Sequence, residues 1–353
     1  MGVCVTPATV PTRGAHDASV PTNSKEPSKN IRICLPPSSQ SNGWVNAQNT
    51  PPKRALLIFN PKSGNGQSPL PRFIAALGDL GWQVDAEELP KEGDLEQVLG
   101  QLERYRAVIA AGGDGTVSSL AYALKYSGVP LMAYPAGTAN LIAQNLDLPD
   151  NPEALAKVVD DFHTVELDLG ELTVEDQVRG FTMLAGAGAD ATMISESEKL
   201  KEKLGVMAYV VSAMKQFQPK FTTFTLEYDG QVKEIEAMAV MVANLGMANF
   251  RLPIASGVSP TDGKLTVLIL KPGSVFDLLG NVLESVKARL GLGDVANHNI
   301  ESFHTEAVVV KSAEPFPLQF DGEIRKENTP FSARVLPGAV KFLTQEAPKK
   351  LDT

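Results

Sequence analysis

The run AVIAAGGDGTVSSLAYAL, residues 107–124, decides the fold class. Its first five residues are apolar, as in a strand that is buried on both faces of a parallel sheet. Three glycines around Asp114 come next. Apolar residues at helical spacing follow, with Val117 and Leu120 on one face and Gly128 as a stop signal. A strand, a glycine turn and a helix start in this order predict a βα unit of an open α/β sheet.

Segments on both sides of this run alternate in the same way up to about residue 162. Four short apolar runs predict strands over residues 53–60, 82–84, 107–111 and 129–134. Helix-length segments between them, such as residues 70–81 and 95–105, predict helices that connect the strands by right-handed crossovers.

The second half of the chain has a different pattern. Short β-type runs, typical of a largely antiparallel arrangement, occur at residues 165–169, 224–228, 237–243, 265–270, 307–311 and 333–336. Two helical stretches, 196–217 and 274–292, interrupt them. The predicted fold class is therefore α/β plus β, with an N-terminal open α/β domain and a β-rich second half.

Residues 1–52 differ from both halves. They are rich in Pro, Ser, Thr, Asn and Gln and show no sustained apolar periodicity, so we expect a disordered tail. The opening MGVCVT, residues 1–6, fits the pattern for N-myristoylation beside a cysteine that palmitoylation would modify. We interpret the segment as a plain tail, with lipidation as the alternative. No apolar stretch of a secretory signal occurs in it.

Composition excludes several classes of protein. The 353 residues include 32 Lys and Arg and 41 Asp and Glu, and the resulting net charge of -9 argues against a nucleic-acid partner. No apolar run approaches the roughly 18 residues that cross a bilayer. The two cysteines, Cys4 and Cys34, leave no disulfide framework or cysteine-built zinc site for the body of the chain. These features predict a cytoplasmic protein.

The glycine turn carries the first chemical signal. At the start of a helix, the unpaired N–H groups and the positive end of the dipole form an anion site, most often a phosphate site. Its residues here are Gly112, Gly113, Asp114, Gly115 and Thr116. A carboxylate would repel a bare phosphate, so a Mg²⁺ ion that bridges Asp114 and the phosphate is the simplest explanation. The alternative is a strand-to-helix turn that uses Gly-Asp-Gly for its geometry alone.

Two further strand ends carry similar residues. Residues 134–140 include Gly137 and Thr138, and residues 60–66 begin with Asn60. The carboxyl ends of parallel strands lie at one edge of the sheet, so the three loops are expected to converge on a nucleotide-sized crevice. The chain has neither a P-loop motif nor a dinucleotide fingerprint with a downstream acid.

Six motifs in this order resemble the diacylglycerol kinase catalytic-domain family, which includes bacterial lipid kinases and sphingosine kinases. The similarity covers about residues 53–345. The motifs are NPKSG (60–64), GGDGT (112–116), PAGTAN (135–140), GAGAD (186–190), TDGKL (261–265) and FDGE (320–323). NAD kinases and phosphofructokinases share Gly-Gly-Asp-Gly, so the specificity lies in the set of six.

The resemblance implies an ATP site between an α/β domain of the NAD kinase/diacylglycerol kinase type and a β-sandwich-like domain. The α/β domain would span residues 53–145, with the last strand (about 331–345) returning to it, and the second domain residues 146–330. Asn60, residues 112–116, Gly137 and Thr138 would bind ATP.

By the same resemblance, Asp321 would be the general base that takes the proton from the acceptor hydroxyl. Phosphoryl transfer needs such a base beside an acceptor held in line. The alternative for Asp321-Gly322 is a plain hairpin turn, as we interpret Asp229-Gly230.

Two positions depart from the family pattern. Asp262 resembles a residue that holds a structural Mg²⁺ in bacterial members, but many relatives carry two acids there and this chain has Thr261 in place of the first. A simple turn is the alternative. Several relatives also place a lysine soon after Ser-Gly, where this chain has residues 65–67, Asn-Gly-Gln. Lys62 or Arg72 would then supply the positive charge for the phosphates.

The sequence thus predicts a kinase that uses ATP and Mg²⁺ to phosphorylate a lipid hydroxyl during transient contact with a membrane surface. Diacylglycerol, a sphingoid base, phosphatidylglycerol and an isoprenoid alcohol all stay open as acceptors, and no motif indicates the oligomeric state. The alternatives are a kinase of a soluble acceptor, such as a NAD kinase, and a nucleotide-binding regulatory protein without activity. The basic amphipathic stretch at 196–217 fits a membrane surface, but we interpret its apolar face as core.

Overall fold

The computed structural model describes residues 52–63, 69–90, 95, 99–188, 221–246, 258–271, 300–320 and 323–345. The predicted tail, apart from Pro52, and the two helices predicted at 196–217 and 274–292 lie outside these residues. Asp190 of the fourth motif lies outside them as well.

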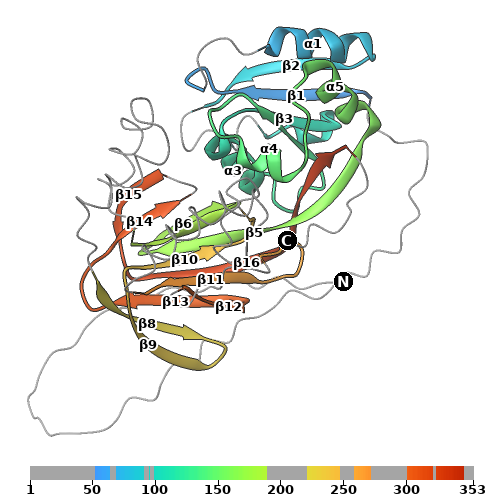
Figure 1. Ribbon diagram of the computed structural model, residues 1–353. Coiled ribbons are helices and arrows are strands. Elements are labelled where there is room, and N and C mark those ends of the chain that lie inside the picture. The colour runs from blue at the N-terminus through green and yellow to red at the C-terminus, as the bar shows by residue number, and fades with distance from the viewer. Residues whose placement is uncertain are drawn as a thin grey trace, which may run out of the picture. The chain divides into compact units, whose positions relative to one another are not determined.

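The first half contains a parallel sheet with helices on both faces (Figure 1). Its strands lie side by side in the order β2-β1-β3-β4. Their bounds are β1 (Arg54–Phe59), β2 (Gln83–Glu88), β3 (Ala107–Gly112) and β4 (Leu131–Pro135). The helices are α1 (Leu70–Asp79), α3 (Asp114–Ala123), α4 (Leu141–Asn145) and α5 (Pro152–Asp161), with a 3-10 turn, η1 (Leu102–Arg104).

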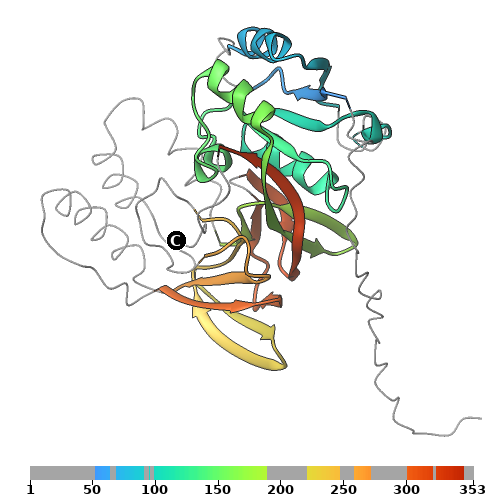
Figure 2. The ribbon, with the colours of Figure 1, turned by 90° about the vertical axis from the view of Figure 1, so that its right-hand side faces the viewer.

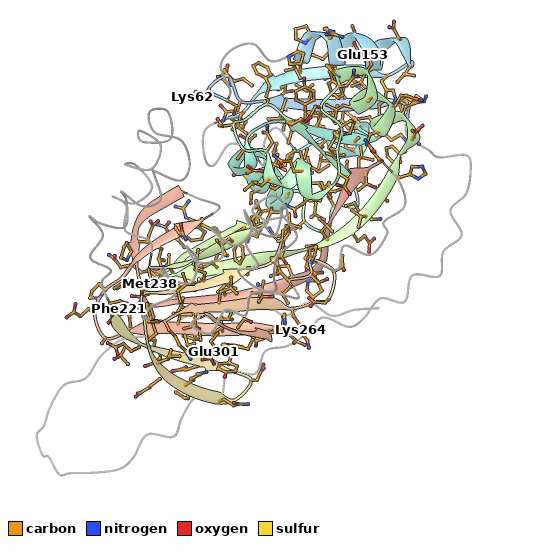
Figure 3. All side chains as sticks on the ribbon, in the orientation of Figure 1. Lys62, Glu153, Phe221, Met238, Lys264 and Glu301 are labelled. Atoms are coloured by element: carbon orange, nitrogen blue, oxygen red, sulfur yellow. The ribbon has the colours of Figure 1, made fainter. Side chains whose placement is uncertain are left out.

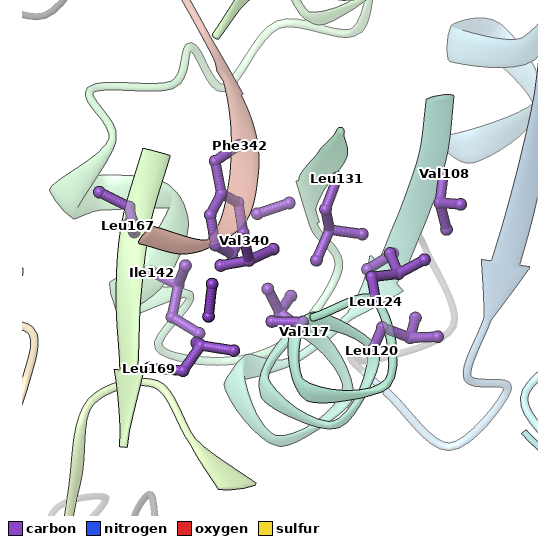
Figure 4. Close-up of a cluster of buried hydrophobic side chains, with 14 of the residues drawn as sticks. Val108, Val117, Leu120, Leu124, Leu131, Ile142, Leu167, Leu169, Val340 and Phe342 are labelled. Atoms are coloured by element: carbon purple, nitrogen blue, oxygen red, sulfur yellow. The ribbon is translucent and has the colours of Figure 1, made fainter. Parts of the chain in front are cut away.

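Both faces of β1, β3 and β4 are buried, which explains why these three strands coincide with largely apolar runs. On β1, Ala55 and Leu57 belong to the cluster that α1 and α5 cover. Leu56 and Ile58 belong to the cluster around α3 and α4, which Figure 4 shows in close-up. Alternate side chains of one strand thus pack into two separate cores, one on each face of the sheet.

The second half is a β-sandwich. One layer continues the first sheet and the other is a separate six-stranded sheet in the order β12-β11-β10-β7-β14-β15. A single apolar cluster, with members such as Phe224 and Val267, fills the space between the layers. The continuing layer contains β5 (His163–Val174), β6 (Gln177–Phe181), β8 (Thr222–Tyr228), β9 (Gln231–Ala237), β13 (Ala307–Ser312) and β16 (Phe331–Thr344). The other contains β7 (Leu184–Ala187), β10 (Ala239–Ala243), β11 (Leu265–Leu270), β12 (Ile300–Thr305), β14 (Pro317–Phe320) and β15 (Glu323–Asn328).

Two long strands belong to both halves. β5 and β16 pair antiparallel along most of their length, and β16 also contacts β4 through the pair Phe342 and Leu131 and β13 through residues 331–334. Figure 2 shows β16, in red, running from one half into the other. The pairing of β5 and β16 shifts register between Leu336 and Val340, and within this bulge Gly338 has a φ of +54°. The α/β-plus-β fold class predicted from the sequence is therefore confirmed.

Several element boundaries were wrong. The strand predicted over 237–243 is two strands, because the chain passes from one layer of the sandwich to the other at Met238. Both layers face the same core, so the apolar run continues across the break. The helix expected over 95–105 ends in turns and the short η1, and the helix after Gly113 ends at Ala123 rather than near Gly128.

Candidate active site

The loops after β1 and β3 are tied together by two side chains. The Asn60 Nδ2 donates to the Thr116 hydroxyl at 3.2 Å, and the Ser63 hydroxyl accepts from the Gly113 N–H at 3.3 Å. The Asn60 Oδ1 also accepts from the Lys62 N–H at 3.0 Å, so both ends of the Asn60 amide are engaged. Asn60 therefore organises these two loops.

The N-terminus of α3 presents main-chain donors at the same edge of the sheet. Gly113 is the N-cap, and no side chain caps the helix. Among the residues that the structure describes, no acceptor is bonded to the N–H groups of Asp114 and Gly115. Unpaired N–H groups at a helix start are suited to an anion such as a phosphate. Thr116, by contrast, is buried and bonded to Asn60.

The loop after β4 packs directly against this helix start. The Ala136 N–H donates to the Gly112 carbonyl at 3.2 Å, and a Cβ on Gly137 would lie only 2.5 Å from the Gly113 Cα. Asn140, in the left-handed region with a φ of +51°, closes the loop. Its Oδ1 accepts from the Gly137 N–H at 2.8 Å and its Nδ2 donates to the Gly137 carbonyl at 2.9 Å. Thr138 lies exposed at the tip of the loop.

Asp114 has a main-chain partner. Its Oδ1 accepts from the Ile142 N–H in the first turn of α4 at 2.8 Å. A carboxylate at a helix N-terminus is stabilised by the N–H groups and the dipole. This bond joins α3 to α4, so the negative charge in the glycine turn has an explanation besides a metal ion.

Asp262 lies in an exposed turn, where its Oδ1 accepts from the Lys264 N–H at 2.9 Å. The buried Asp168 nearby accepts from Gly263 N–H and Gly338 N–H, each at 2.7 Å, so both of its oxygens are occupied. Burial raises the pKa of Asp168, and the charge of Asp262 raises it further. Among the described residues, no group of three or more His, Cys, Asp or Glu side chains could hold a metal ion. The Asp262 metal site stays a prediction.

Asp321 and Gly322 lie outside the described residues, as do Gly64 of the first motif and residues 65–68 after it. The strands that Asp321 connects are described: β14 and β15 pair antiparallel, with Phe320 opposite Glu323. β14 lies next to β7, with Phe320 opposite Ala185. The fourth and sixth sequence motifs are therefore carried by neighbouring strands of one sheet.

Sequence reasoning assigned no role to Ser63, Asn140 or Ile142. All three lie in or beside the quoted motifs, but their bonds cross from one loop to another and leave no local signal. Asn140 had one indication, since asparagine is among the residues that adopt a positive φ before a helix.

Comparison with known families and proteins gives the same picture along the whole body of the chain. A family model described as "Diacylglycerol kinase catalytic domain" matches residues 54–172, and one described as "YegS C-terminal NAD kinase beta sandwich-like domain" matches residues 183–344. An uncharacterised Synechocystis protein is 30% identical over 307 residues, which are 82% of this chain and 70% of that protein. A Staphylococcus aureus diacylglycerol kinase is 29% identical over 282 residues, 77% and 86% of the two chains.

Solved structures are similar at the level of the fold. A diacylglycerol kinase from Bacillus anthracis has a TM-score of 0.63 at 21% identity and covers 83% of this chain and 97% of its own. An Archaeoglobus fulgidus NAD kinase in complex with ATP has a TM-score of 0.50 at 16% identity, covering 83% and 94%. In the described part of this chain, no helix is both long and apolar enough to span a bilayer.

Proposed function

This chain belongs to the diacylglycerol kinase catalytic-domain family, and from that premise we propose that it transfers the γ-phosphoryl group of ATP to the hydroxyl of a lipid. The carrying observation is the helix start at Gly113. Its unpaired N–H groups lie where the ends of three parallel strands meet. Such donors bind phosphate without needing a charged side chain.

The nucleotide would be held by three loops. The N–H groups of Asp114 and Gly115 and the exposed Thr138 would contact phosphate oxygens, while Asn60 and Gly137 keep the loops in place. Phosphoryl transfer depends mainly on positioning and electrostatic stabilisation, so a rigid main-chain cradle supplies what the reaction needs.

Mg²⁺ would accompany ATP and neutralise charge on its phosphates. Asp114 is the acidic residue of the glycine turn itself, and one of its oxygens, Oδ1, accepts from the Ile142 N–H. The other would contact the metal through water, as carboxylates commonly do for a Mg²⁺ that keeps much of its hydration shell.

Asp321 would act as the general base. It follows β14 in the sandwich half, and we expect its carboxylate to accept the proton of the lipid hydroxyl as that oxygen attacks the γ-phosphorus. We therefore expect Asp321→Asn to lower kcat by about 10²-fold or more, the usual effect of losing a general base. ATP affinity should be nearly unchanged, which calorimetric titration would measure.

Asp229→Asn is the matched control for this variant. Asp229 begins another Asp-Gly pair of the sandwich, in the hairpin between β8 and β9, where its Oδ1 accepts from the Thr305 hydroxyl at 2.9 Å. We expect it to retain activity. Full activity of Asp321→Asn would remove Asp321 from its role.

The acceptor is tested by incubating the protein with labelled ATP, Mg²⁺ and a panel of lipids in mixed micelles. NAD is supplied in a parallel reaction. A labelled lipid is the expected product. Formation of NADP instead would favour the alternative function, a kinase of a soluble acceptor, as in the Archaeoglobus NAD kinase of similar fold. ATP binding with no transfer in any reaction would favour a regulatory protein.

A further inference from the structure

Glu171, on β5, joins three elements through one buried carboxylate. The Tyr122 hydroxyl, from α3, donates to the Glu171 Oε2 at 2.6 Å. The Arg334 Nε, from β16, donates to the Glu171 Oε1 at 2.6 Å. Glu171 is 7% exposed, whereas the Arg334 side chain is 63% exposed. A buried carboxylate is tolerated when it is paired and hydrogen-bonded, as both oxygens are here.

Tyr122 is suited to a permanent donor role. Burial and the neighbouring Glu171 carboxylate raise the pKa of its hydroxyl above the usual range. Its ring packs against β6, where a Cβ on Gly180 would lie 2.1 Å from the ring. The absence of a side chain at Gly180 therefore lets α3 approach the sandwich half closely.

A second bond fixes the same helix to the sandwich half. The Ser118 hydroxyl of α3 accepts from the Thr182 N–H at 3.0 Å, in the chain between β6 and β7. The first turn of α3, meanwhile, lies in the candidate nucleotide site. A helix of 10 residues is about 15 Å long, so even a small rotation of α3 about its Tyr122 end also moves its first turn.

We propose that Glu171 is a positioning residue that sets the orientation of α3, and through it the phosphate-binding N–H groups, relative to the sandwich half that carries Asp321. The inference rests on the proposed function, in which the lipid hydroxyl beside Asp321 of the sandwich half must reach the ATP phosphate held by the α/β half. Loss of the Tyr122 bond would leave the nucleotide loop intact but free to tilt. ATP would then bind with similar affinity and react more slowly.

The chain supplies a matched control. Tyr105, Asp85 and Arg54 form a second tyrosine–carboxylate–arginine group, in which Arg54 Nε donates to Asp85 Oδ2 at 2.8 Å, and burial and the neighbouring Asp85 carboxylate raise the pKa of the Tyr105 hydroxyl. Tyr105 is buried, as Glu171 is. The Arg54–Asp85 pair joins β1 to β2 within the α/β half, and the Tyr105 ring belongs to the same apolar cluster as Val117 and Leu120 of α3. Tyr105→Phe keeps that ring in place and removes the hydroxyl alone.

The experiment compares Tyr122→Phe with Tyr105→Phe in the full chain. We expect Tyr122→Phe to lower kcat about tenfold or more, with KM for ATP nearly unchanged, since a displacement of about 1 Å can cost up to about 10²-fold. Tyr105→Phe should lower the thermal midpoint without a comparable loss in kcat. Glu171→Gln, which keeps the shape of the side chain, should lower kcat to a similar extent as Tyr122→Phe.

Hydrogen exchange provides a readout that needs no turnover. The hydrogen-bonded amides of Gly113, Thr116 and Val117 should exchange faster in Tyr122→Phe than in the parent protein, and their exchange should be unchanged in Tyr105→Phe. Equal kcat losses in the two tyrosine variants, or unaltered exchange of these three amides in Tyr122→Phe, would overturn the inference. A parent protein without kinase activity would instead refute the proposed function, and the exchange measurement would still decide whether Glu171 positions α3.

Discussion

Gly113 and Gly137 face each other at the candidate nucleotide site and tolerate a methyl group differently. A Cβ on Gly113 would lie 3.6 Å from the Gly137 Cα, an ordinary contact, and the Gly113 φ of −83° suits any residue. A Cβ on Gly137 would lie 2.5 Å from the Gly113 Cα and 3.0 Å from the Asn140 Oδ1. The protein itself therefore needs glycine at 137, whereas only a ligand that approaches the main chain needs it at 113.

We expect Gly113→Ala to keep the thermal midpoint of the parent protein but to weaken ATP binding, because the added methyl group projects where main chain and phosphate meet. Gly137→Ala should lower the free energy of unfolding by about 1–3 kcal/mol, the usual cost of overpacking. Calorimetric titration with ATP and thermal unfolding separate the two effects. Unaltered ATP affinity of Gly113→Ala would contradict the main-chain cradle.

Lys62 is the stronger of the two cations that the sequence offered for the phosphates. The Arg72 guanidinium is bonded to Glu153 at 2.7 Å, which lowers the pKa of that carboxyl. Lys62 has no ion pair among the described residues and lies in the loop after β1; Figure 3 shows it on a different side of the α/β half from Glu153.

We therefore expect Lys62→Met to weaken ATP binding about tenfold or more while AMP binding changes less, since a hydrogen bond to a charged group contributes about 1.5–3 kcal/mol. Lys62→Arg should restore most of the affinity, and Arg72→Met should not change it. Fluorescence titration with ATP, ADP and AMP analogues measures the series. A loss of the same size for all three nucleotides would show that Lys62 does not act on the terminal phosphates.

The sequence located the three loops of the candidate nucleotide site but not the hydrogen bonds within and between them. Asp114 illustrates the limit: its charge in a glycine turn called for a cation, whereas the Ile142 N–H, 28 residues further on, already binds one of its oxygens. The partner belongs to another helix, and the spacing of residues near Asp114 gives no sign of it.

Among the helices, α5 is one that the periodicity analysis overlooked, although its start carries local signals. Asn151 caps it with its Oδ1 accepting from the Ala154 N–H at 2.9 Å, Pro152 occupies the first turn, and Phe162 ends it with a φ of +60°. Its alanines weaken the apolar pattern, yet Leu155 and Val159 are buried against the sheet. Capping residues, read before periodicity, would have found this helix.

Replacement of the cap tests this explanation. We expect Asn151→Ala to lower the free energy of unfolding by about 1 kcal/mol, whereas Asn151→Asp, which keeps an acceptor at the same place, should have little effect. Urea unfolding monitored by circular dichroism measures both. Equal stability of Asn151→Ala and the parent protein would mean that Pro152 and the packing of α5 fix its start without the cap.

Strands were predicted well where both faces are buried and poorly where they are not. β1, β3 and β4 are buried and apolar along most of their length and were found within two residues of their bounds. β2, at the edge of the sheet, has the sequence QVDAEE with no fully buried side chain, so only its first residues carried a signal. Exposed edge strands lack the pattern that burial imposes.

For the whole molecule, the decisive feature is the pair of strands that belong to both halves. β5 and β16 pair through ten residue pairs, interrupted at the bulge around Gly338. Asp168 fixes that bulge and, through Gly263, the turn before β11. The sequence predicted a strand at 333–336 but not the 14-residue β16, because the bulge at Pro337-Gly338 resembles a strand end. The resemblance to a known family, not the local pattern, led us to expect the return of the last strand.

Because β5 and β16 run through both halves, we expect the two halves to unfold in one transition. Trp82 lies in the α/β half, 4% exposed, with its Nε1 bonded to Asp160, and Trp44→Phe would make it the sole tryptophan. Its fluorescence and the far-ultraviolet circular dichroism, to which the sandwich strands contribute strongly, should then report the same urea midpoint. Asp168→Ala should separate the two midpoints by releasing the bulge, whereas Asp262→Ala, in the neighbouring exposed turn, should leave them together. Separate midpoints in the Trp44→Phe protein itself would mean that β5 and β16 do not couple the halves, and that the geometry between phosphate and acceptor is set by the bound substrates instead.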